Sequence, residues 1–297
     1  MPVCVVLATI LWWWPQQAFA PDSMLGWVLC ALTTCICMET NAIQHVIRIR
    51  TRMMSCVWLM LASSMSFTHT WGAPAISAAC LAISYYLLFR CYQLYDSTSW
   101  VYHSFLFLGL GSIFSSLMLF MGILYYIYLI CFLRSLTWRG FWAGILGMIT
   151  PYWCLAIWYL ATGRMEEIQE FLTSTMVWEP VSWQALASMP LTNTVTIGIV
   201  FLLSLAGLFH YMQTRYNDKI HVRMILYIYT SQTILLMAYL LLQPGQYENI
   251  MALLVVSSSP LIAHYFSLTD SWFSNMFFIL SLLLCGTIAY FNLWMPF

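Results

Sequence analysis

The stretch HSFLFLGLGSIFSSLMLFMGILYYIYLICFLR, residues 103–134, decides the fold class of this chain. It contains no Asp, Glu or Lys, and its only Arg is the last residue, Arg134. A transmembrane helix needs about 20 apolar residues, so the stretch is too long for one ordinary span and short for two. Arg90 precedes it and Arg139 follows it, and basic residues favour the cytoplasmic side of a membrane. An even number of crossings must join two cytoplasmic ends, which predicts two short helices.

The break between these two helices is expected near Ser115-Ser116 or Met121-Gly122. Small and polar residues at both places allow a tight turn. A plain short hairpin and a re-entrant hairpin both fit the pattern, and half-length helices can mark substrate sites in transporters. The sequence leaves both alternatives open.

The composition extends this interpretation to the whole chain. Of 297 residues, 62% are hydrophobic, 17% aromatic and 7% charged, whereas an ordinary soluble domain has roughly 25% charged residues. This composition predicts an all-α, polytopic transmembrane helical bundle, with residues 1–297 forming a single transmembrane domain in contact with membrane lipid. The net charge is zero and no basic cluster is interleaved with aromatics, so nucleic acid is excluded as a partner.

Hydrophobic runs separated by short loops predict about eleven spans. Short loops make sequence neighbours pack antiparallel, as in an up-and-down bundle. The predicted spans run roughly over residues 3–20, 24–44, 53–69, 74–91, 103–118, 119–134, 141–162, 193–213, 224–242, 249–267 and 273–294.

The basic residues predict the orientation of these spans. With the N-terminus inside and the C-terminus outside, nine of the ten basic residues lie on the cytoplasmic side and only Arg164 lies opposite. This asymmetry predicts a multi-pass protein of the inner (cytoplasmic) membrane. Ala18-Phe19-Ala20 imitates a signal-peptide cleavage site, but no Lys or Arg precedes it, so we expect a retained first span. The nine residues are Arg48, Arg50, Arg52, Arg90, Arg134, Arg139, Arg215, Lys219 and Arg223.

An external amphipathic segment is predicted at residues 163–192. Its apolar side chains Met165, Ile168, Phe171 and Leu172 share one helical face, as in a helix lying at the membrane interface. Two interpretations stay open. The helix either floats at the headgroups or is the surface where a substrate, or a membrane or envelope protein partner, meets the chain.

A candidate intramembrane polar site lies at the inner end of the second predicted span and comprises Glu39, Asn41, Arg48, Arg50 and Arg52. Arg48 is about 13 Å along a helix from Glu39, too far for direct pairing. We therefore expect Glu39 to face the bundle and to have a partner on another helix. Three interpretations stay open. Glu39 is a proton-coupling carboxylate, or the cluster of Arg48, Arg50 and Arg52 contacts an anionic headgroup, or Glu39 is an ordinary interfacial acid beside positive-inside arginines.

Other candidates for chemistry are isolated in the sequence. A proton relay through His103, His210 or His264 needs a carboxylate within reach, and Asp270 follows His264 by six residues, outside the spacing that shares a helix face. Asp22 stands alone as a possible base. No nucleotide-binding, hydrolase or metalloprotease motif occurs, so we predict no catalytic residue, no metal site and no cofactor.

The segment from Arg134 to Tyr152, RSLTWRGFWAGILGMITPY, resembles a family of uncharacterised polytopic inner-membrane proteins of Bacteroidetes. That family shares an Arg-containing cytoplasmic turn followed by a span of Gly...Pro-Tyr pattern. The resemblance extends loosely to Arg48–Arg52 and to the apolar hairpin before Arg134, about half of the chain. It implies the fold and the location and brings no assigned activity.

The function expected from the sequence is non-catalytic. It is transport or flipping of a hydrophobic or lipid-linked molecule, or support of an envelope complex. The alternative is a membrane-embedded enzyme of envelope glycan assembly, similar in outline to polysaccharide polymerases.

Overall fold

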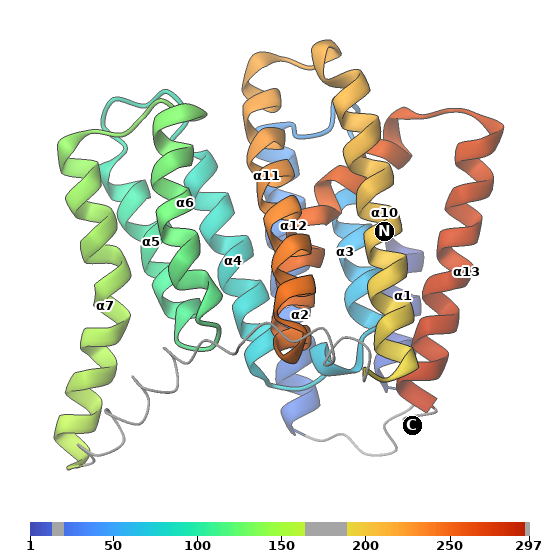
Figure 1. Ribbon diagram of the computed structural model, residues 1–297, viewed down its shortest axis with the longest axis horizontal. Helices are drawn as coiled ribbons and strands as arrows, with labels where there is room; N and C mark the ends of the chain where they lie inside the picture. The colour runs from blue at the N-terminus through green and yellow to red at the C-terminus, as the bar shows by residue number, and fades with distance from the viewer. Residues whose placement is uncertain (14–20, 164–188, 295–297) are drawn as a thin grey trace. The chain divides into compact units, whose positions relative to one another are not determined.

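The computed structural model describes residues 1–13, 21–163 and 189–294, and every regular element in these ranges is a helix (Figure 1). Backbone groups inside a bilayer must bond within their own segment, which favours helices in so apolar a chain. The all-α prediction is confirmed. The α-helices are α1 (Pro2–Trp13), α2 (Pro21–Gln44), α3 (Met53–Ser63), α4 (Ala73–Phe89), α5 (Thr98–Ser112), α6 (Leu117–Cys131), α7 (Trp138–Thr162), α10 (Leu191–Thr214), α11 (Ile220–Leu242), α12 (Tyr247–Leu268) and α13 (Trp272–Trp294).

Six helices of the described chain are long and apolar enough to cross a membrane: α2, α7, α10, α11, α12 and α13. The protein is therefore a membrane protein. Four further apolar helices, α1, α3, α4 and α6, are shorter than this. The external segment predicted at 163–192 lies almost entirely outside the described residues, and so do Met165, Ile168, Phe171 and Leu172.

Helix α3 is shorter than the span predicted over residues 53–69. It has 11 residues, or about 16 Å of helix. Hydroxyl groups at its end bond to the carbonyls of its last turn: Ser64 Oγ donates to Leu61 O at 2.7 Å, and Thr68 Oγ1 donates to Ala62 O at 2.6 Å. Such bonds compete with helix continuation, and a short 3-10 turn, Ser66–Thr68, follows.

The apolar stretch over residues 103–134 forms two helices, as predicted. Helix α5 ends at Ser112 and α6 begins at Leu117, so the break includes Ser115-Ser116. Each helix has 15 residues, or about 22 Å of length. Whether the pair crosses the membrane or re-enters stays a prediction.

The chain divides into two compact units, one formed by Met1–Ala75 with Ser182–Phe297 and the other by Ile76–Val181. The expectation of one domain over 1–297 stays a prediction. In the second unit α5 packs closely on α7, because a Cβ at Gly109 would lie 2.6 Å from Met148 O. Ser84 and Ser104 each donate a hydrogen bond to the other's carbonyl, at 2.8 and 3.0 Å, which ties α4 to α5.

In the first unit, α12 is the central helix. In the apolar 18-residue part of α12, 83% of the residues are buried, against 28% in the corresponding part of α13. Helices α3, α10 and α11 pack around it (Figure 1). A helix that is enclosed on all sides can hold polar groups away from lipid, and α12 places His264 in this position, with no exposed surface.

Candidate functional site

Asp218 is a fully buried carboxylate in the short connection between α10 and α11. A 3-10 turn, Arg215–Asn217, follows α10, and α11 begins at Ile220. The Asp218 side chain has 0% exposure. A buried ionised carboxylate without partners is very costly, so the groups that meet it define the site.

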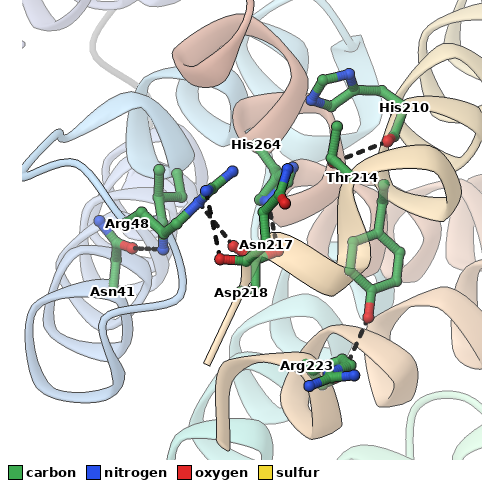
Figure 2. A network of polar contacts seen from close by, with 10 residues as sticks. Asn41, Arg48, His210, Thr214, Asn217, Asp218, Arg223 and His264 are labelled. Carbon is green, nitrogen blue, oxygen red and sulfur yellow. Dashed lines mark hydrogen bonds and ion pairs between the residues drawn. The ribbon is translucent and has the colours of Figure 1, made fainter. Parts of the chain in front are cut away.

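Two side chains distant in sequence converge on Asp218 (Figure 2). Arg48 Nε lies 2.8 Å from Oδ1, and His264 Nε2 lies 3.2 Å from Oδ2. The contact between Arg48 and Asp218 is an ion pair whose geometry is not that of a hydrogen bond to Oδ1. Arg48 Nη1 also donates a hydrogen bond to Asn217 O at 3.4 Å. His264 is fully buried, whereas the Arg48 side chain is 38% exposed. The site thus has a buried end and an end open to the surroundings.

Asn41 holds the loop that carries Arg48. Its Nδ2 donates to Thr51 O at 2.7 Å, and its Oδ1 accepts from Ile47 N at 3.1 Å. His45 has a φ of 51°, which turns the chain sharply after α2. One buried amide therefore bridges both sides of the loop and positions Arg48 against Asp218.

His210 and Tyr211 of α10 complete the surroundings. The His210 and His264 rings lie 5.6 Å apart, and the Tyr211 ring lies 5.9 Å from His264 with its edge toward it. The Tyr211 hydroxyl donates to Arg223 O at 3.1 Å, which ties α10 to the start of α11. Among the described residues, neither His210 Nε2 nor His264 Nδ1 has a hydrogen-bond partner.

This arrangement can take up and release protons. With Nε2–H directed at Asp218, a neutral His264 keeps Nδ1 free to accept a proton. The negative charge of Asp218 is shared between Arg48 and His264. No group of three His, Cys, Asp or Glu side chains within the described ranges could hold a metal ion.

The structure separates the five residues of the predicted intramembrane site. Asn41 and Arg48 belong to the network around Asp218, while Arg50 and Arg52 are exposed on the same loop and its exit. The expectation that Glu39 faces the bundle is wrong, because its side chain is exposed. Helix α2 buries a different face, formed by Thr33, Cys37, Thr40, Asn41 and Gln44.

Sequence reasoning missed the partner of His264. Asp218 precedes it by 46 residues, and only the nearby Asp270 was considered. The available signal was a histidine inside the apolar run of α12, which requires a polar partner somewhere in the bundle.

No protein-family model, curated protein or solved structure matches this chain. The resemblance to the Bacteroidetes family stays a prediction.

Proposed function

We propose that this chain is a multi-pass inner-membrane protein that moves an anionic lipid-linked molecule across the bilayer, with Asp218 as its proton-accepting group. The observation that carries the proposal is the buried Asp218 carboxylate held between Arg48 and His264. Ionisable groups inside membrane proteins are costly, and they mark proton relays and substrate paths.

Charge balance gives the coupling between the proton and the anion. A proton on Asp218 removes the negative charge that Arg48 faces. Arg48 is partly exposed, and Arg50 and Arg52 are exposed beside it, so a released Arg48 can pair with a phosphate-type headgroup. Anion binding at the arginines and proton uptake at Asp218 then favour each other, as linkage requires. His210 and Tyr211 face the same network from α10, and Arg223 at the start of α11 contacts Tyr211.

Eleven spans with the N-terminus inside and the C-terminus outside form part of the proposal. Two segments predicted to be cytoplasmic, the loop with Arg48 and the connection with Asp218, meet at one end of the first unit, which supports this topology. A reporter enzyme fused after Arg139 is expected to read as cytoplasmic and one fused after Phe297 as periplasmic. A cytoplasmic C-terminus would overturn the span count.

Lipid movement is tested in liposomes that contain the purified protein and phosphatidylglycerol with a fluorescent headgroup label. Dithionite added outside quenches label in the outer leaflet, so inner-leaflet label is lost only if lipid crosses. Fast loss is expected for the native protein. It should fall about tenfold, a barrier change of about 1.4 kcal/mol, for Asp218→Asn. Glu39→Gln, which alters an exposed carboxylate on neighbouring α2, should move lipid at the native rate.

The controls separate specific movement from leakage. Labelled phosphatidylcholine, which has no net charge, should move more slowly than phosphatidylglycerol, because Arg48, Arg50 and Arg52 select negative headgroups. If phosphatidylglycerol stays as protected as in protein-free liposomes, the proposal fails.

The burial of the site favours transport over an enzyme of glycan assembly. Asp218 and His264 have no exposed surface, whereas a general base must come within hydrogen-bond reach of its substrate. The exposed group of the network is Arg48, which can bind an anion but cannot act as a base at neutral pH.

A further inference from the structure

Sulfur atoms gather where the start of α1 packs against the start of α3. The thiol of Cys56 donates a hydrogen bond to Met1 Sδ at 3.6 Å, and it also interacts with the thiol of Cys4. Ser55 Oγ donates to the same Met1 Sδ, likewise at 3.6 Å. Two thiols and one thioether therefore meet in one place within the first unit.

These sulfur atoms border a cavity of about 200 Å³ that is lined by α1, α3, α10, α12 and α13. Six of the 14 described residues that line it carry sulfur, whereas the whole chain has 10 cysteines and 19 methionines among 297 residues, about one in ten. Among these lining residues only Ser281 has a side-chain oxygen, and its Oγ already donates to Phe278 O at 2.7 Å. The residues with sulfur are Met1, Cys4, Met53, Cys56, Met60 and Cys285.

The chemistry of this lining selects the class of ligand. An ordered water molecule needs two to four polar partners, and Mg²⁺ and Ca²⁺ are bound by oxygen ligands. Zinc is bound by thiolate, imidazole and carboxylate groups, and no His, Asp or Glu is among the described residues that line the cavity. Thiolate together with thioether sulfur is the soft ligand set that suits Cu(I).

The spacing of the sulfur atoms fits ligands that share one metal ion. Metal–sulfur bonds are about 2.3 Å long, so two sulfurs at trigonal or tetrahedral angles on one ion lie about 3.8 to 4.0 Å apart. Cys56 Sγ and Met1 Sδ are 3.6 Å apart. An ion placed between them requires a shift of only a few tenths of an ångström, which the flexible methionine side chain can absorb.

The cavity also has a way in. Cys56 is buried, whereas Cys4, Met1 and Met53 are partly exposed. An ion can therefore reach the partly exposed sulfurs from the surroundings and pass to the buried thiol, as a metal site requires.

We propose that Cys4, Cys56 and Met1 bind one Cu(I) ion in this cavity. Each thiol that bonds to the ion releases its proton to the solvent, and copper stays in the same oxidation state, so charge and atoms balance. Groups of three His, Cys, Asp or Glu side chains do not include this site, because its third ligand is a thioether. The inference is independent of lipid movement and of Asp218.

Copper binding is tested with the full-length protein, purified in detergent without oxygen and with all thiols reduced. Cu(I) is supplied as its coloured complex with bicinchoninate, and the loss of colour measures transfer to the protein. The native protein should take up one equivalent of Cu(I), and Cys4→Ser with Cys56→Ser should take up none. Cys30→Ser with Cys37→Ser, which alters two buried cysteines of α2, is the matched control and should take up copper as the native protein does.

Two further measurements identify the ligands. X-ray absorption of the copper-loaded protein should show sulfur neighbours at about 2.3 Å. Because binding releases protons from thiols, uptake from bicinchoninate should increase as the pH rises. Oxygen or nitrogen neighbours in place of sulfur would overturn the site.

The remaining outcomes also decide the proposal. It is overturned if the native protein leaves the colour unchanged, or if the variant without Cys4 and Cys56 takes up as much copper as the control. A disulfide between Cys4 and Cys56, detected by mass spectrometry, that persists under the reducing conditions of the assay would overturn it as well. Should the double variant fail to fold, Cys4→Ser alone replaces it and should lower the affinity for Cu(I) by more than about tenfold.

Discussion

Two buried histidines lie in the unit formed by Met1–Ala75 and Ser182–Phe297, and their surroundings differ. His264 has 0% exposure and bonds to the Asp218 carboxylate. His69 has 2% exposure, its Nε2 lies 3.0 Å from Ser63 O, and its ring stacks on Trp12 at 3.9 Å. In both, Nδ1 has no hydrogen-bond partner among the described residues. The difference is the charge of the group that meets Nε2.

That difference assigns the two histidines different roles. No ion pair involves His69 in the described chain, and burial lowers its pKa to about 4, so at neutral pH it is an uncharged flat ring that packs on Trp12. His264 belongs to a network that contains both a negative and a positive group. In this chain the histidine that meets a carboxylate belongs to the candidate site, and the histidine that meets a carbonyl packs against Trp12.

The largest effect is expected from Asp218→Ala, which removes the carboxylate that both Arg48 and His264 contact. It leaves Arg48 and His264 without an anion, and breaking a buried pair costs about 3 kcal/mol of unfolding free energy. Thermal unfolding in detergent measures the loss. Asp270→Ala, an exposed acid, is the matched control and should change stability by less than about 0.5 kcal/mol. If both variants unfold at the same temperature, the contacts of Asp218 do not contribute to the free energy of unfolding.

The pH dependence of His69 comes next in size. Its folded pKa of about 4 lies below the unfolded value of about 6.5, so the unfolded state binds more protons as the pH falls. The contribution of His69 to the free energy of unfolding is therefore fully present above pH 6.5 and is lost as the pH decreases toward 4. Between pH 7 and pH 5 the loss amounts to about 2 kcal/mol. In His69→Phe, which keeps a flat ring against Trp12, this part of the pH dependence should be missing from the unfolding curves.

Hydrophobic runs predicted the all-α fold, because the length and composition of an apolar run are properties of local sequence, whereas the eleven-span count and the orientation stay predictions. The break at Ser115-Ser116 was also predicted from local sequence. The site was predicted only in part. Asn41 and Arg48 stand near a span end and attract attention, whereas the pairing of Asp218 with His264 depends on how α10, α11 and α12 pack. The prediction that Glu39 faces the bundle was wrong, because the angular position of a residue on the helix, rather than its depth along the helix, decides which side chain faces the bundle.

A smaller effect is expected at the open end of the network. Arg48 is 38% exposed, so water screens part of its interaction with Asp218, and Arg48→Gln should cost about 1 kcal/mol. In Arg48→Gln the rate of lipid movement should fall strongly although the free energy of unfolding changes little, because the variant removes the charge that binds the anion. Arg48→Lys keeps that charge and should retain part of the rate. A stability loss as large as that of Asp218→Ala would show that Arg48 is structural.

The smallest effect is expected at Glu39, which is two residues from Asn41 and therefore lies on the other face of α2. Its side chain is exposed, so Glu39→Gln removes a charge without breaking a buried contact and should change the unfolding free energy by less than about 0.5 kcal/mol. Asn41→Ala is the companion variant, because it removes two hydrogen bonds that hold the Arg48 loop, at about 1 kcal/mol each. Both variants are compared with the native protein by thermal unfolding and by the lipid assay. If Glu39→Gln proves the more damaging of the two, the polar face of α2 has been assigned to the wrong side, and the carboxylate that couples protons must be sought at Glu39 instead of Asp218.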